Sequence, residues 1–309
     1  MILLLIAALV LPLGLDLYMP VPSSNPMTTE KVDVGRRLFN DRRLSRDRSV
    51  ACASCHDPRR AFSDGRAIPI GVDGRHGRRS APAIVNRGYG RAFFWDGRSA
   101  TLEEQVLLPI QDPNEMGLTL DEATARTSLP VPRIAEGLAS YVRSILSGDS
   151  RYDRFMNGDW NALSPLEQRG LTIFRGKGNC IACHAGPNFS DERFHVTGVA
   201  WQQPARGQAI VLRDEGRFAV SHRSEDRGAF KTPTLREIGR TAPYMHDGTL
   251  STLDAVVDFY DQGGRPNPQL DPELRPLHLA ADEKRALISF LKTLSGTVSE
   301  GVSLLKAGT

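Results

Sequence analysis

Cysteine is scarce in this chain of 309 residues, which contains only four. The sequence also has few long hydrophobic segments and no marked excess of charge of either sign. The formal net charge is only +3 and no basic run alternates with aromatic residues, so nothing in the sequence indicates nucleic-acid binding. No segment shows the sustained apolar/polar alternation that is typical of a half-buried strand. The composition, with 40% hydrophobic and 24% charged residues, is ordinary for a globular protein.

The one uninterrupted hydrophobic run lies at the N-terminus, from Ile2 to Leu13. It is too short to cross a bilayer, which a helix spans with about 20 residues. Its length suits the apolar region of a secretory signal, although no Lys or Arg precedes it and no A-x-A cleavage site follows. We expect residues 1–22 to direct export, as a signal or a membrane anchor, and we expect the protein to be periplasmic.

All four cysteines fall in two short motifs. These are Cys-x-x-Cys-His units, made of Cys52, Cys55 and His56 and of Cys180, Cys183 and His184. Two thiols at this spacing can each add to a vinyl group of one haem, which places the adjacent imidazole beneath the iron. A redox dithiol would need no histidine, and a zinc site would need two cysteine pairs that converge without it. The sequence therefore predicts two covalently bound c-type haems.

The segments around the two motifs are also alike. Residues 28–66 and 164–193 each contain a helix start, an apolar and basic helix, a polar loop, the motif and then Phe-Ser-Asp. The second helix begins with a capping box formed by Ser164 and Glu167. Because the repeat is well over a hundred residues long, it indicates a duplicated domain. We expect domains over residues 23–150 and 151–309, with a boundary near Gly148 to Ser164.

Helical periodicity dominates elsewhere. Apolar residues recur on one face over residues 133–146 and 281–294, and Thr101 with Glu104 would cap a helix that Pro109 ends. Segments 64–91 and 198–228, rich in glycine, proline and arginine, are expected to be loops that surround a cofactor. The predicted fold class is all-α.

Fifteen arginines lie within the first 98 residues. They form either a solvated surface or cationic partners for buried carboxylates, and the haem propionates would be such carboxylates.

Six longer motifs make the chain resemble the bacterial family of di-haem cytochrome c peroxidases and MauG. They are CASCHDPRRAFSDGR, FFWDGRSATLEEQ, DPNEMG, FRGKGNCIACH, FKTPTLREIGRTAPYMHDGTLSTLDAVVDFY and LISFLKTLSG, in the family's order. The resemblance implies two cytochrome c-like domains whose haems face the domain interface, often with a calcium ion between them. Thr241 and Pro243 match positions that offer backbone carbonyls to calcium, and Ser80 stands where the family has an asparagine ligand.

The resemblance also implies roles around the first haem. His56 matches the proximal ligand of the peroxide-binding haem. Glu115, in DPNEMG, matches the distal acid-base residue, which can take a proton from the near oxygen of peroxide and return it to the far one. Gln105 and Pro109 fall where the lining of the distal pocket is expected. Trp95, in FFWDGR, matches the tryptophan that lies between the two haems.

One position departs from the peroxidases at this first haem. Resting peroxidases close it with a histidine sixteen residues after the motif histidine, but here that residue is Val72, which cannot bind iron. His76, nearby, is either a misaligned ligand or an ordinary loop histidine. We therefore expect the first haem to be open without prior reduction.

A second departure concerns the other haem, whose proximal ligand matches His184. The peroxidases place a methionine fourteen residues after the histidine of PYxHDG, and here Tyr260 stands at that distance from His246, as in MauG-like enzymes. Phenolate is a hard anionic donor that lowers the haem potential. Met245 is the rival ligand.

Both departures favour MauG-like chemistry, in which hydrogen peroxide generates a high-valent di-haem state that oxidises a protein. In MauG the substrate residues are tryptophans of methylamine dehydrogenase, which become tryptophan tryptophylquinone. MauG passes charge through a surface tryptophan just before its second motif, where this chain has Gly178. Trp160 and Trp201 are either substitutes for it or structural.

Two other functions compete with this one. A di-haem cytochrome c peroxidase would reduce peroxide with electrons from a small cytochrome c or cupredoxin. A non-enzymatic di-haem carrier would only relay electrons, and Val72 argues against it because a carrier gains nothing from an open iron.

Overall fold

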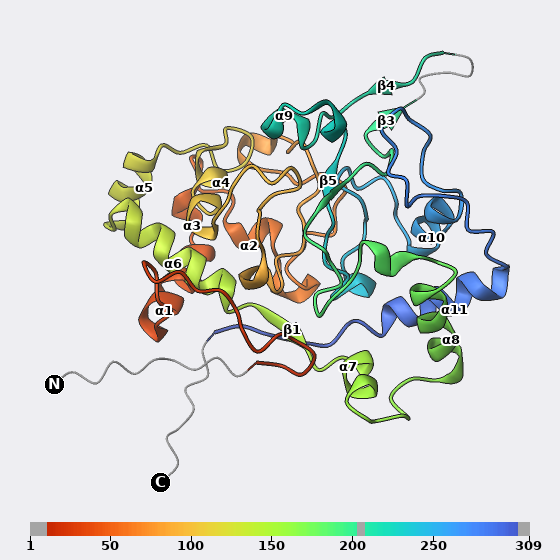
Figure 1. Ribbon diagram of the computed structural model, residues 1–309. Coiled ribbons are helices and arrows are strands. Elements are labelled where there is room, and N and C mark those ends of the chain that lie inside the picture. Colours follow the sequence, from red (N-terminus) through yellow and green to blue (C-terminus); the bar gives the residue numbers. More distant parts are fainter. Residues whose placement is uncertain (1–10, 203–207, 302–309) are drawn as a thin grey trace, which may run out of the picture.

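Two packed helix pairs frame the fold. The computed structural model describes residues 11–202 and 208–301. In the N-terminal half α1 (Thr29–Phe39) packs on α6 (Val131–Arg143), and in the C-terminal half α8 (Pro165–Arg175) packs on α11 (Ala281–Lys292). The two pairs lie on either side of the molecule, and loop-rich chain fills much of the space between them (Figure 1).

Both pairs approach closely because glycine lies at each crossing. A Cβ on Gly35 of α1 would lie 2.0 Å from the carbonyl oxygen of Gly137 in α6. A Cβ on Gly170 of α8 would lie 2.0 Å from the carbonyl oxygen of Ala286 in α11. No other residue would let these backbones meet, so the same packing device occurs once in each half.

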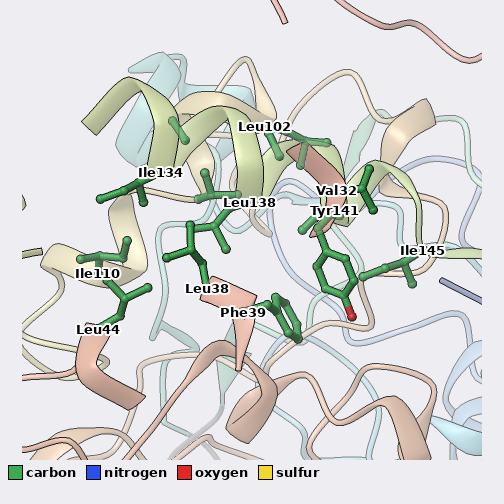
Figure 2. Close-up of a cluster of buried hydrophobic side chains, with 14 of the residues drawn as sticks. Val32, Leu38, Phe39, Leu44, Leu102, Ile110, Ile134, Leu138, Tyr141 and Ile145 are labelled. Atoms are coloured by element: carbon green, nitrogen blue, oxygen red, sulfur yellow. The ribbon is translucent and has the colours of Figure 1, made fainter. Parts of the chain in front are cut away.

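The halves have separate hydrophobic clusters. The N-terminal cluster lies beneath α1 and α6, with side chains of both helices pointing into it (Figure 2). Its labelled members are Val32, Leu38, Phe39, Leu44, Leu102, Ile110, Ile134, Leu138, Tyr141 and Ile145. The C-terminal cluster surrounds α8, α10 (Leu253–Asp261) and α11, and it includes Leu171, Phe174, Val257, Leu287 and Phe290.

The helix ends bear out most of the sequence signals. The Ser164 hydroxyl accepts the backbone N–H of Glu167, whose carboxylate accepts the N–H of Ser164, so the predicted capping box starts α8. Thr101 likewise caps α3 (Leu102–Gln105). The prediction that Pro109 ends this helix is wrong: α3 stops at Gln105, and Pro109 lies in the first turn of α4 (Leu108–Gln111), where its missing N–H costs nothing.

The remaining helices are short. They are α2 (Cys52–Cys55), α5 (Leu120–Thr127), α7 (Arg151–Met156) and α9 (Phe218–Ser221).

Three two-stranded sheets within the described residues make the all-α prediction correct only in outline. The antiparallel pairs are β1 (Leu146–Gly148) with β6 (Thr297–Ser299), β2 (Phe194–His195) with β5 (Phe230–Lys231), and β3 (Trp201–Gln202) with β4 (Val211–Leu212). Strands of two or three residues are too short for an alternating pattern to appear. Segment 198–228, predicted as a loop, therefore contains β3, β4 and α9.

The chain before α1 lies against the folded protein. Leu13 and Asp149 exchange two hydrogen bonds, of 2.9 and 3.0 Å, and the buried Met19 joins the N-terminal cluster. Much of the predicted export segment, residues 1–10, lies outside the described residues, whereas in residues 11–22 Met19 is buried and Leu17 and Tyr18 are exposed. Within the described part, no helix is long and apolar enough to cross a membrane.

Candidate active site

A cavity of about 1060 Å³ lies between the two halves, and both Cys-x-x-Cys-His motifs line it. It exceeds the roughly 300–1,000 Å³ of an ordinary ligand pocket. Every other residue predicted for the site also lines it, namely Ser80, Trp95, Gln105, Pro109, Glu115, Thr241, Pro243 and Tyr260. The fold therefore brings residues that lie between positions 39 and 277 of the sequence together around one cavity.

The two motifs adopt nearly the same local geometry. The first forms α2 and the second a 3-10 turn over Cys180–Ala182. In each, the backbone N–H of the histidine donates to the carbonyl of the first cysteine, at 2.9 Å for both His56 and His184. This turn brings the thiols and the imidazole of each motif to the same wall of the cavity.

Each motif histidine is oriented by a backbone carbonyl. His56 Nδ1 lies 3.2 Å from the carbonyl oxygen of Phe62, and His184 Nδ1 lies 2.8 Å from that of Phe189. A carbonyl can only accept, so Nδ1 carries the proton and Nε2 keeps its lone pair. Burial lowers the pKa of both imidazoles, which favours this neutral form. A histidine fixed in this way is ready to ligate a metal through Nε2.

These features fit two c-type haems. All four cysteines are free, so each motif offers two thiols. Apolar side chains from both halves line the cavity, among them Ile84, Val106, Leu138, Leu235, Val256 and Leu277. The residues present thus supply the covalent anchors, the proximal imidazoles and the apolar walls that such a cofactor needs.

Comparisons with known proteins agree with this chemistry. A family profile described as di-haem cytochrome c peroxidase matches residues 29–161. The chain is 38% identical over 293 residues to the methylamine utilization protein MauG of Methylorubrum extorquens, covering 89% of this chain and 81% of that protein. It is 32% identical to the cytochrome c551 peroxidase of Nitrosomonas europaea, covering 90% and 83%.

The structural comparison gives the same result. The crystal structure of a MauG-like protein associated with microbial copper homeostasis matches with a TM-score of 0.79 at 35% identity, covering 92% of this chain and 94% of that one. The chain belongs to the di-haem cytochrome c peroxidase family. It is therefore a peroxide-dependent di-haem oxidoreductase, and its family implies two haems of the c type.

In this peroxidase-family chain, the residues predicted for peroxide activation cluster near the first motif. Gln105, Pro109 and Glu115 all line the cavity, and the Glu115 carboxyl lies close enough to Cys52 and Cys55 to raise the pKa of both thiols. Burial raises the pKa of the Glu115 carboxyl to about 7, with the Asp112 carboxylate adding to the effect and Arg98 opposing it. A carboxyl with this pKa can both accept and donate a proton near neutral pH.

The position that peroxidases use to close the first haem is turned away from the cavity. Val72 is fully buried, and its backbone N–H donates to the carbonyl oxygen of Glu115 at 2.9 Å. Gly71 lines the cavity, while Val72 is absent from the lining. His76 is exposed, as expected for a loop histidine.

Tyr260 lies on the side of the second motif. It comes from α10, and burial raises the pKa of its phenol, with the neighbouring Cys183 and Cys180 acting in the same direction. Met245 also lines the cavity, from a backbone position with φ of +71°.

The duplication extends further than the sequence analysis recognised. Isolated β-bridges join Phe93 to Ser99 and Tyr244 to Leu250, and Thr101 and Thr252 then cap α3 and α10 at equal spacing. Counted from these caps, Pro109 and Tyr260 occupy equivalent positions, and so do Trp95 and His246. The similarity of FFWDGRSATL to PYMHDGTLSTL is the sequence signal that could have shown this.

Two further histidines in the cavity wall were missed by sequence reasoning. His246 is buried and stacks on Phe230 with ring centroids 3.6 Å apart. His195 has both ring nitrogens on carboxylates, Nδ1 at 2.6 Å from Asp271 and Nε2 at 2.9 Å from Asp191. No motif signals the His195 contacts, because Asp271 lies far along the chain.

Among the described residues, one group of three has metal-ligand atoms within 4.8 Å of one another: Cys183, Asp191 and His195. Cys183 is an attachment cysteine and both His195 nitrogens are already engaged, so this group does not suit a metal. Of the candidate calcium ligands, the Ser80 carbonyl oxygen accepts the indole N–H of Trp95 at 2.8 Å.

The other two tryptophans differ in exposure. Trp160 is 69% exposed and Trp201 only 9%. At Gly178, the position where MauG has its surface tryptophan, a Cβ would lie 2.8 Å from the carbonyl oxygen of Ile173, so a side chain would require the backbone to shift.

Proposed function

We propose that this enzyme is MauG-like: it uses hydrogen peroxide to oxidise a side chain of a partner protein. The observation that carries the proposal is the placement of Tyr260, whose phenol is buried in the cavity beside Cys180 and Cys183. When bound, the two haems supply peroxide activation and the storage of oxidising equivalents. The protein residues determine which haem meets peroxide and which is closed.

On the first side, we assign His56 as proximal ligand and Glu115 as acid-base group. With Val72 outside the cavity lining, no described side chain at that position closes the iron. Glu115 accepts the proton of the incoming peroxide and returns it to the departing oxygen, for which its pKa of about 7 is suited. Gln105 and Pro109 shape the space in which this transfer occurs.

On the second side, we assign His184 and Tyr260 as the residues that would hold the haem iron. Burial raises the pKa of the Tyr260 phenol and so keeps it protonated when no iron is bound. A bound iron cation would stabilise the phenolate instead. An anionic oxygen donor lowers the potential of the haem, which suits storage of oxidising equivalents better than delivery of electrons at high potential. Pro109, at the equivalent position of the first half, cannot ligate. One site is thus closed and the other open.

Trp95 is proposed as the relay between the two sites. It lines the cavity, packs against the small cluster around Phe230, and lies where the halves meet. Its indole N–H donates a hydrogen bond to the carbonyl oxygen of Ser80. This bond orients the ring, but a carbonyl is too weak a base to remove the indole proton.

The proposed partner is a protein with oxidisable aromatic side chains. The MauG relatives are named for methylamine utilization, which makes an amine dehydrogenase precursor the leading candidate. The MauG-like structure linked to copper homeostasis extends the group beyond that setting. We further propose two cytochrome c-like domains, over 23–150 and 151–309, a periplasmic location, and a calcium ion near Ser80, Thr241 and Pro243.

Spectroscopy of the oxidised holoprotein tests the assignment. We expect the as-isolated ferric enzyme to show one high-spin and one low-spin haem by EPR, and to react with one equivalent of peroxide without prior reduction. A long-lived near-infrared charge-resonance band should follow. Two low-spin haems at rest, with peroxide reactivity only after partial reduction and with a small cytochrome c or cupredoxin as donor, would instead identify a detoxifying peroxidase.

A further inference from the structure

Lys231 is a buried cation in the cavity wall. It ends β5, exposes only 8% of its surface and lines the cavity. Its backbone N–H donates to the carbonyl oxygen of Trp95 at 2.8 Å, which fixes the residue where the two halves meet. The ammonium group is therefore held inside the protein, at the edge of the space that receives the cofactors.

Among the described residues, the carboxylate that lies within 4 Å of this ammonium is that of Glu192, and it is already shared. Lys231 Nζ lies 3.6 Å from Glu192 Oε1, beyond the usual hydrogen-bond distance. Arg87 contacts the same carboxylate with two guanidinium nitrogens, at 2.7 and 3.1 Å, and the backbone N–H of Arg91 donates to it at 3.2 Å. Glu192 is thus bound mainly to Arg87, and Lys231 is left with a long contact.

The charges of this group do not balance. Arg87 and Lys231 carry two positive charges, and Glu192 carries one negative charge. Burial lowers the pKa of Lys231 to about 7, and the charge of Arg87 acts in the same direction, while the carboxylates of Glu192 and, more weakly, Asp191 oppose both. The Asp191 carboxylate is engaged by His195 Nε2 at 2.9 Å, so within the group of Arg87, Lys231 and Glu192 one positive charge is unbalanced. A buried ammonium is costly unless a partner compensates it.

Other cations in the cavity wall are committed or exposed. Arg79 donates to both Asp96 and Asp214 at 2.7–2.8 Å. Arg236 is bound to Asp153 and to two backbone carbonyls. The cavity-lining arginines that are exposed are Arg78, Arg98, Arg213 and Arg275.

We propose that Lys231, with Arg87 held beside it by Glu192, binds a propionate carboxylate of one of the two haems. A propionate is the anion that a c-type haem brings into this cavity, and an ammonium paired with it forms a charge-assisted hydrogen bond. The proposal requires only that the cavity holds haem, and it does not depend on whether the enzyme oxidises a protein. It assigns to one lysine and one arginine a role that the sequence suggested for the N-terminal arginines as a group.

Resonance Raman spectroscopy of the ferric holoprotein tests this contact through the propionate bending modes. In Lys231→Met we expect two covalent haems by pyridine haemochrome, and a downshifted bending mode for one of them because its hydrogen bond is lost. Lys231→Arg should keep the wild-type band, as should Lys292→Met, which removes an exposed lysine. Two attached haems with unshifted modes in Lys231→Met would overturn the proposal.

Glu192→Gln provides a second test that does not remove the lysine. It frees both cations from their shared carboxylate while keeping the shape of the side chain. The propionate mode should then shift upward, because both cations act on the propionate alone. If Lys231→Met does not fold, an unshifted mode in Glu192→Gln overturns the proposal by itself.

Discussion

Trp95 and His246 pack edge to face where the two halves meet, with ring centroids 6.5 Å apart and planes inclined by 69°. The backbone of Ser80 joins them: its carbonyl accepts the indole N–H of Trp95, and its N–H donates to the carbonyl of His246 at 2.7 Å. Burial lowers the pKa of His246 to about 4, so the imidazole beside the indole is neutral at physiological pH. A neutral neighbour does not oppose the loss of an electron from Trp95.

Replacing Trp95 with phenylalanine should therefore separate the two haems electronically. Phenylalanine fills most of the same space but is much harder to oxidise than indole. We expect peroxide still to be consumed at the first site, while the near-infrared charge-resonance band disappears. Trp201→Phe, which changes a buried tryptophan outside the cavity lining, should keep the band. An undiminished band in Trp95→Phe would show that charge passes by another route.

Glu115→Gln should slow peroxide activation by about 10²-fold or more, the contribution expected of a positioned acid-base group. Glutamine keeps the shape and cannot exchange the proton. Stopped-flow absorbance with one equivalent of peroxide measures the rate. An unchanged rate would remove Glu115 from the mechanism.

The pH profile gives a sharper test of the same residue. Only the ionised carboxylate can accept a proton from peroxide, so the wild-type rate should rise with pH through about 7. Asp112→Asn removes a negative charge that raises the pKa of Glu115, so the rise should move to lower pH. In Glu115→Gln the rise should be absent, and its persistence would assign the titration to another group.

Tyr260→Phe should convert the low-spin haem to another ligation state. Phenylalanine preserves the packing of α10 but offers no oxygen donor. We expect the low-spin EPR signal of the wild-type protein to be lost or replaced, with both haems still attached. Met245→Leu, which removes the rival donor, should leave that signal unchanged. If the low-spin signal were instead lost in Met245→Leu and retained in Tyr260→Phe, Met245 would be the ligand.

The sequence was most informative where the chemistry requires particular side chains at fixed spacing. The two motifs and the Ser164 capping box could be predicted because each depends on residues a few positions apart. Lys231 and Glu192 could not be paired in advance, because their contact depends on loops and on a left-handed backbone at Glu192, with φ of +56°. The two-residue strands could not be predicted because they are too short for an alternating pattern to appear.

A stability prediction follows from a buried ion pair near the boundary of the halves. Arg236 and Asp153 are each about 1% exposed in their side chains, and Arg236 Nη2 lies 2.9 Å from Asp153 Oδ1. Arg236→Met would leave a buried carboxylate without its cation, which costs about 3–5 kcal/mol. Chemical denaturation of the holoprotein measures the free energy of unfolding.

Arg169→Met is the matched control, because its partner Asp282 lies on the surface and both side chains are about half exposed. Exposed pairs contribute about 1 kcal/mol or less. Equal decreases in the free energy of unfolding in the two variants would mean that burial of the Arg236–Asp153 pair does not increase its contribution to stability.

Trp160 is the residue that we expect to carry oxidising equivalents to the protein surface. Its ring lies 5.4 Å from Phe155 in α7, and Tyr152 in the same helix lies 5.1 Å from Phe189. The carbonyl of Phe189 in turn accepts the hydrogen bond of His184. Helix α7 thus carries one aromatic side chain that contacts Phe189, beside His184, and another that contacts Trp160, which is 69% exposed.

In the absence of a partner protein, we expect oxidising equivalents that leave the second motif by way of α7 to oxidise Trp160. Peptide mass spectrometry after peroxide treatment should find oxygen added at Trp160 in the wild-type protein and little at the buried Trp201. Glu115→Gln should protect Trp160, because its oxidation would require activation at the first haem and not peroxide alone. Equal oxidation of Trp160 in both proteins would mean that free peroxide attacks an exposed indole and that no oxidising equivalents leave by way of α7.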